Sequence, residues 1–276
     1  MWGPKPRSRH LPTRARLAVI GMVLLLPAAC SGDDPGPGLD ARVGKPASSA
    51  PPDPRAGIPE VGQCHLLDPN AVNVIVDTTD PLPDCTGTHT SRTFHVDVVP
   101  PGTTVPVAEI AFEACAGALE AGTGLDSAQL LGSFITWLWF EPTPEQKEAG
   151  AAWFRCDVVA SEGEGELIPL PTGTATGDVF GGTVGPAYKR CIRNGGDTDG
   201  DGLDEAIHVA CSGEHDYEWS GAFDPGFDTY PSEDEFFARA QDECGRIAGT
   251  EDWWSTWPSR DAWEGGEHRI SCFRAV

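Results

Sequence analysis

The stretch DTDGDGLDE, which begins at Asp197, carries oxygen-bearing groups at a spacing that suits a cation. Its candidate ligands are Asp197, Asp199, Asp201, the backbone carbonyl of Leu203, and Glu205 at the ninth position. Ca²⁺ takes hard oxygen ligands of this kind. An EF-hand would have a glutamate at the twelfth position, where His208 stands, and the following AIHVAC alternates like a strand. We therefore predict a structural calcium loop between strands; the alternative is a solvated acidic turn.

Two histidines occupy matching positions in the motifs CTGTH and CSGEH, where His89 and His215 each stand four residues after a cysteine. A zinc site needs three or four convergent ligands, and cysteines in disulfides cannot serve as ligands. We therefore predict that each histidine is structural and uses a hydrogen bond to fix the start of a strand. The alternative function is an envelope hydrolase acting on the cell wall, with His89 or His215 as its acid–base group.

Catalytic motifs are otherwise missing from the sequence. There is no GxSxG, no HExxH and no Ser/His/Asp set shared by the two histidine-bearing segments. With 42 acidic residues, a pair of carboxylates can always be selected, so such a pair indicates nothing. The sequence therefore predicts a protein that binds rather than an enzyme.

The N-terminus has the features of an export signal. Five basic residues precede an apolar run from Leu17 to Leu26, which is too short for a spanning helix of ~20 residues. The run leads to LPAAC, which resembles a bacterial lipobox and implies that Cys30 becomes the lipidated first residue of the mature chain. We predict a signal peptide over 1–29 and an extracytoplasmic protein anchored to the plasma membrane as a lipoprotein; the alternative is plain secretion.

Cysteine count and charge support this location. Of nine cysteines, eight remain once Cys30 is lipidated, which is the even number that disulfides require. The chain has 42 acidic and 19 basic residues, and five of those bases lie in the signal peptide. So acidic a protein repels nucleic acid and anionic lipid headgroups, and it favours cations or basic partners.

The remaining cysteines divide into two sets with similar spacing. They are Cys64, Cys85, Cys115 and Cys156, followed by Cys191, Cys211, Cys244 and Cys272. In both sets, a proline lies 14 residues and a glycine 6 residues before the last cysteine. We predict two copies of one module over 61–160 and 188–276. Residues 30–60 and 171–187 are rich in proline or glycine and are predicted to be a disordered tether and a linker.

Each copy has the pattern of a small α+β module with a few antiparallel strands and one main helix. In TFHVDVVP, alternate apolar residues share one face, which is typical of a half-buried strand. VAEIAFEACAGALEAG and PSEDEFFARAQDECGRIAG have helical spacing, and WLWF and the closing WFRCDVV and HRISCFRAV are predicted strands. Four cysteines allow three pairings per module; first with second and third with fourth would be natural if a hairpin lies between the first two.

Tryptophans gather at Trp253, Trp254, Trp257 and Trp263, with a counterpart around Trp137, Trp139 and Trp153. An exposed set would stack on cell-wall sugars, which makes peptidoglycan an alternative partner. Small modules with few other large apolar residues favour the core as their place.

Together these features carry a family resemblance. GQC, a cysteine four residues before a histidine, a strand ending in proline, a helix with a cysteine at its middle, and a closing Pro, Gly and Cys segment resemble the septum-formation domain of actinobacterial envelope proteins. The resemblance covers Gly62 to Val159 and Tyr188 to Val276. It implies a role around cell division, with envelope or division proteins as partners and no catalytic activity. We therefore expect a lipid-anchored binding or scaffolding protein.

Overall fold

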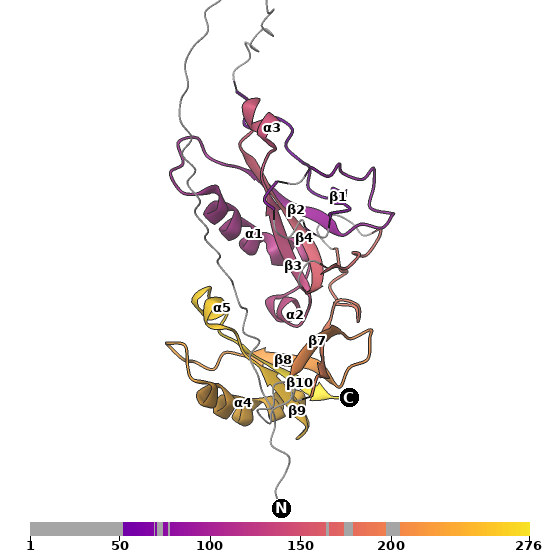
Figure 1. The fold of residues 1–276 in the computed structure, drawn as a ribbon, viewed down its shortest axis with the longest axis vertical. Helices are drawn as coiled ribbons and strands as arrows, with labels where there is room; N and C mark the ends of the chain where they lie inside the picture. The colour runs from indigo at the N-terminus through magenta and orange to yellow at the C-terminus, as the bar shows by residue number, and fades with distance from the viewer. Residues whose placement is uncertain are drawn as a thin grey trace, which may run out of the picture. The chain divides into compact units, whose positions relative to one another are not determined.

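The structure is a computed structural model, and it describes residues 52–68, 70, 74–76, 78–163, 166–173, 179–196 and 205–276 (Figure 1). The predicted signal peptide, Cys30 and most of the predicted tether lie outside the described residues. Two antiparallel sheets, each with a main helix, and four disulfides confirm the predicted α+β class. All described residues belong to one unit of the chain.

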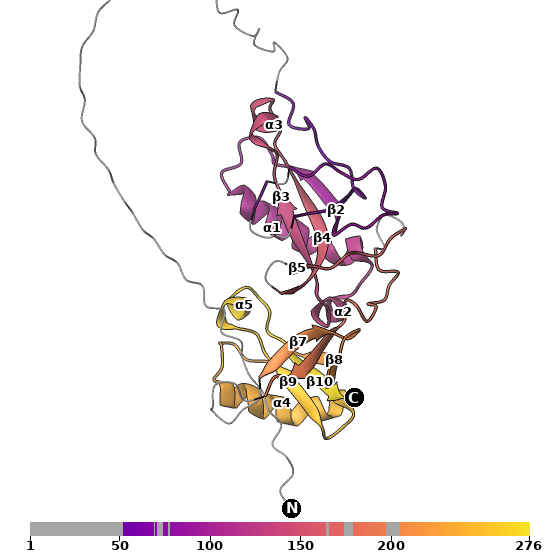
Figure 2. The same ribbon diagram turned by 45° about the vertical axis from the view of Figure 1, so that its right-hand side comes forward.

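The first sheet has the strand order β1-β2-β4-β3, and β5 pairs with the end of β4. Its strands are β1 (Cys64–His65), β2 (Ser91–Val98), β3 (Ile135–Phe140), β4 (Trp153–Gly163) and β5 (Glu166–Leu167). Helix α1 (Val107–Thr123) packs along one face of this sheet in both views (Figure 2). It ends at Gly124, whose φ of 72° is a left-handed conformation that glycine adopts without a Cβ clash.

The second sheet has the order β7-β6-β8-β10-β9. Its strands are β6 (Arg190–Asn194), β7 (Ala206–Ala210), β8 (Tyr217–Phe223), β9 (Trp253–Thr256) and β10 (Ile270–Ala275). Helix α4 (Glu233–Ala248) covers one face and begins with a capping box between Ser232 and Glu235. Its Phe236 is fully buried and stacks on Trp257, with ring centroids 5.4 Å apart.

The order of strands recurs between the sheets. If β7 is set aside, both sheets place their strands in the chain order first, second, fourth and third. In each half a long helix follows the second strand, and a short helix, α3 (Pro144–Glu148) or α5 (Arg260–Glu264), follows the third. A further short helix, α2 (Ser127–Leu131), stands only in the first half. The predicted duplication would produce such a recurrence, and the two copies stay a prediction; β7 has no counterpart in the strand order of the first sheet.

The disulfides follow the first-with-second and third-with-fourth pattern in both halves. The bonds are Cys64–Cys85, Cys115–Cys156, Cys191–Cys211 and Cys244–Cys272. The third and fourth cysteines of each half join the main helix to β4 or to β10, and all four are fully buried. A covalent bond therefore holds each helix against its sheet.

The described parts of the two proline- and glycine-rich segments, residues 52–60, 171–173 and 179–187, make contacts that their composition does not predict. The end of the predicted tether packs on the first sheet, because Ala152 donates its N–H to Pro54 O and Trp153 Nε1 donates to Ala56 O. In the predicted linker, Val179 and Phe180 are buried in the first core. A few backbone carbonyls and two apolar side chains suffice to dock these residues on the first core. The average composition of a segment does not reveal such individual contacts.

The four clustered tryptophans of the second half lie in the core, as predicted. Trp253, Trp254, Trp257 and Trp263 are each at most 7% exposed. In the first half Trp153 is buried, while Trp137 and Trp139 are partly buried against the same core. The buried tryptophans are therefore not available to stack on sugar rings.

Candidate functional site

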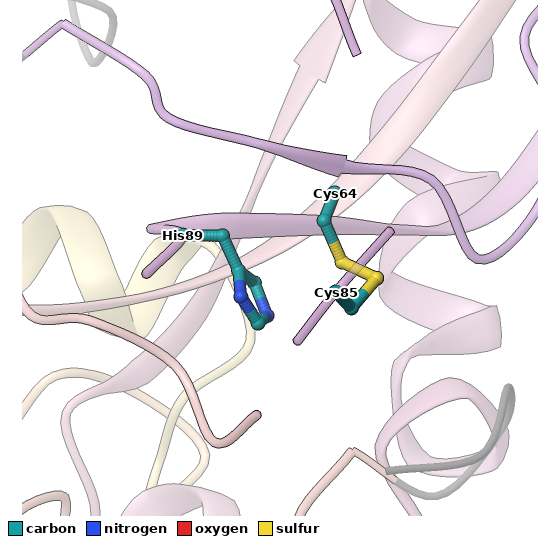
Figure 3. A group of neighbouring side chains, drawn as sticks. All are labelled: Cys64, Cys85 and His89. Atoms are coloured by element: carbon teal, nitrogen blue, oxygen red, sulfur yellow. A yellow bond between two sulfur atoms is a disulfide. The ribbon is translucent and has the colours of Figure 1, made fainter. Parts of the chain in front are cut away.

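His89 lies beside the Cys64–Cys85 disulfide (Figure 3). The side chain is fully buried, and its Nδ1 lies 2.9 Å from the carbonyl oxygen of Gly87. The potential ligand atoms of Cys64, Cys85 and His89 all lie within 4.8 Å of one another. The two sulfurs are bonded to each other, so they cannot bind zinc as thiolates, and in this oxidised form the group is not a zinc site.

His215 makes the same local contact in the second half. Its Nδ1 lies 2.7 Å from the carbonyl oxygen of Gly213, and its Nε2 lies 3.7 Å from Glu218 Oε1. The pKa of Glu218 lies below its ordinary value mainly because Arg274 donates a hydrogen bond to its carboxylate. The charges of Lys189 and His215 lower this pKa further. Both histidines precede the second main strand of their sheet by two residues, a geometry that suits a role in fixing strand starts.

The same geometry bears on the hydrolase alternative. A general acid–base group must come within hydrogen-bond reach of the proton that it transfers. The ring of His89 is fully buried, whereas the side chain of His215 is 15% exposed. Acid–base chemistry in this conformation would therefore depend on His215 alone.

The predicted calcium loop connects two strands. Beyond the last β6–β7 pair, Asn194 with Ala206, Gly195 donates to Glu205 O and Glu205 donates to Gly196 O. Four of the predicted ligands, Asp197, Asp199, Asp201 and Leu203, lie outside the described residues. Glu205 is described and stands at the base of the connection, which the Cys191–Cys211 disulfide closes from the other end of the hairpin. A connection between strands agrees with the predicted type of loop.

A polar pocket of about 500 Å³ lies next to this hairpin. Its lining comes from both halves and comprises Phe134, Ser161, Glu162, Arg190, Glu205, Ala206, Ile207 and His208. Arg190 Nη2 donates to the carbonyl oxygen of Ser133, and the guanidinium lies over the Phe134 ring, 5.5 Å from its centroid. Burial, with the charge of Arg190 beside it, lowers the pKa of His208 to about 4. The imidazole is therefore neutral near pH 7.

This pocket offers both hydrogen-bond donors and hydrogen-bond acceptors. Arg190 supplies a positive charge, Glu162 and Glu205 supply negative charges, and His208 supplies a neutral ring. Glu162 Oε1 already accepts a hydrogen bond from the Ala210 N–H. In the sequence, His208 stands out only by its position in the calcium motif. No local pattern indicates the pocket, because its residues come from separate segments of the chain.

Comparisons with known proteins place these features in context. A family model described as septum formation matches residues 61–272, and the one match spans both cysteine-bearing segments. None of the curated proteins and none of the solved structures compared matches the chain. Among the residues that the structure describes, no helix is long and apolar enough to cross a membrane.

Proposed function

Since the chain belongs to the septum-formation family, we propose that it is an extracytoplasmic, lipid-anchored protein that binds or scaffolds other envelope components during septum formation. Family membership supports a role in cell division or the cell envelope. The proposed extracytoplasmic location is supported by the pairing of all eight described cysteines in disulfides. Such bonds persist in oxidising compartments and are rare in the cytosol.

The proposed mechanism is tethering. Cys30 carries the lipid, and about 20 residues separate it from Pro54, which accepts the first backbone hydrogen bond from the first sheet. A coil of that length reaches about 25 Å. The folded part is then held close to the membrane surface, where it meets envelope and division proteins. The family is not known as an enzyme family, and the proposal assigns no catalytic step.

The anchor is tested by replacing Cys30 with serine, which removes the thiol that accepts the lipid. We expect the wild-type protein in the membrane fraction, labelled by a fatty-acid analogue, and the Cys30→Ser variant in the soluble extracytoplasmic fraction without label. The physical reason is that a serine side chain has no thiol to which the lipid can be attached. A Cys30→Ser variant that stayed with the membrane and resisted a salt wash would contradict a lipid anchor.

The proposal also includes a structural calcium ion between β6 and β7, held by Asp197, Asp199, Asp201, Leu203 and Glu205. Its support is the ligand spacing and the hairpin on which the loop stands. The site should be weak, with a Kd of ~0.1 to 1 mM. At ten times Kd, calcium would stabilise the folded chain by about 1.4 kcal/mol and would raise the melting temperature.

Calorimetry and thermal melts test the ion. We expect the rise in melting temperature to disappear in an Asp199→Asn/Asp201→Asn variant and to persist in the control Asp228→Asn, where an exposed aspartate far along the chain changes. No heat and no rise in melting temperature up to 5 mM calcium would rule the ion out.

A further inference from the structure

A larger cleft, of about 970 Å³, lies beside β1 and β5. Its lining residues are Leu66, Leu67, Asp68, Thr79, Thr90, Glu162, Glu166, Leu167, Ile168, Pro169, Ala187, Ala210 and Ser212. Most of this lining is apolar or carries a hydroxyl. Its volume lies at the upper end of the range of ~300 to 1,000 Å³ found for ligand pockets.

The charge of the cleft has a single sign. Asp68, Glu162 and Glu166 line it, and none of its lining residues is lysine, arginine or histidine. All three acids are exposed. The N–H of Ala210 donates to Glu162 Oε1 at 3.0 Å, so that carboxylate is held in place. The cleft therefore presents fixed negative charge to anything that enters it.

Apolar surface lies between these carboxylates. Leu66 is 51% exposed, whereas its neighbour Leu67 is 4% exposed and packs with Phe140 and Val159. Leu167 and Ile168 continue the apolar lining. An exposed leucine at the mouth of a cleft is surface that a bound partner would remove from water.

We propose that this cleft binds a basic, partly apolar polypeptide segment of a partner protein. Lysine or arginine side chains of that segment pair with Asp68, Glu162 and Glu166, and its apolar side chains cover Leu66 and Leu167. The net charge, −23 for the full chain and more negative once the five bases of the signal peptide are removed, raises the local concentration of such a segment and speeds its encounter with the cleft. The inference rests on the proposed binding function and names the site and the chemistry of its partner.

Fluorescence anisotropy with defined peptides tests the proposal. The protein is the exported, disulfide-closed chain carrying Cys30→Ser, and the probe is a fluorescein-labelled peptide of glycine, lysine and leucine repeats. Two comparison peptides replace lysine with glutamate or leucine with serine. We expect saturable binding of the first peptide only, weakened by salt because the attraction is electrostatic.

Matched charge reversals locate the binding. Asp68→Lys/Glu166→Lys should weaken the peptide's affinity at least tenfold. Glu113→Lys/Glu148→Lys, which reverses two exposed acids outside the cleft, should change it less than twofold although the net charge is the same. Leu66→Ser should weaken binding at least fivefold with little effect on folding, since Leu66 is already half exposed.

Equal losses of peptide affinity in the two charge-reversal variants would show that the peptide is attracted to the acidic surface as a whole. That result would overturn the proposal that the cleft is the binding site. So would binding of the glutamate peptide, or no saturable binding at all. The assay uses purified protein and does not depend on location in the cell. Its failure would therefore leave the septal role standing, and a protein found away from the septum would leave cleft binding standing.

Discussion

We expect that replacing both Cys115 and Cys156 with alanine lowers the free energy of unfolding by about 4 kcal/mol. This disulfide closes a loop of 41 residues, and without it the unfolded chain gains conformational freedom. Both cysteines are fully buried between α1 and β4, so the alanines also lose packing contacts. Denaturant unfolding followed by tryptophan fluorescence measures the change, because Trp153 lies in the same sheet.

The Cys64–Cys85 bond provides the comparison. It closes a loop of 21 residues, and Cys85 is only partly buried, so its removal should cost less, about 3 kcal/mol. A loss below 1 kcal/mol for the Cys115/Cys156 variant would contradict a covalent role in holding α1 on the sheet. A larger loss of unfolding free energy on removal of Cys64–Cys85 than on removal of Cys115–Cys156 would also contradict that role.

The second large effect is expected at Asp157, which lies fully buried in β4. Its carboxylate accepts hydrogen bonds from Ser91 Oγ and Thr93 Oγ1 and pairs with Arg155 Nη2 at 3.2 Å. Asp157→Asn removes the negative charge that pairs with the buried guanidinium of Arg155, while the cost of burying that guanidinium remains. We expect the free energy of unfolding to fall by about 3 to 5 kcal/mol in denaturant titrations.

Two further variants make this expectation specific. Asp228→Asn changes an exposed aspartate and should stay within about 0.5 kcal/mol of the wild type. Arg155→Met/Asp157→Leu removes both charges and should cost less than Asp157→Asn alone, since no unpaired charge remains. If the double variant were the less stable of the two, the buried pair would be stabilising in its own right, which would contradict this expectation.

The main helices and strands could be predicted from the sequence because their signals are local. The apolar spacing of VAEIAFEACAGALEAG gives α1, and the Ser232 to Glu235 capping box marks the start of α4. The disulfide pairing follows in part from local organisation, since the β6–β7 hairpin brings Cys191 to Cys211 and a helix–strand pair joins the last two cysteines of each half. Cys85 lies in no helix or strand, so no hairpin explains its bond to Cys64. Capping boxes at Asp126 and Thr143 begin two further short helices, α2 and α3, and are local signals of the same kind.

Features that depend on distant segments could not be predicted. In WFRCDVV, Arg155 and Asp157 alternate with apolar residues and have the pattern of a solvent face. The structure buries them because this face is also covered, with Leu67, Phe140 and Val159 packing together there. The polar pocket and the acidic cleft likewise combine residues from both halves, which no periodicity or motif brings together.

Imaging of the protein in dividing cells of its host tests the proposed role in septum formation. A fluorescent fusion to the C-terminus would be followed through division together with a membrane stain. We expect the fusion to gather at the septum while the septum forms, and the Cys30→Ser fusion not to gather there. A lipidated fusion that stays evenly spread over the envelope throughout division would contradict a role in septum formation.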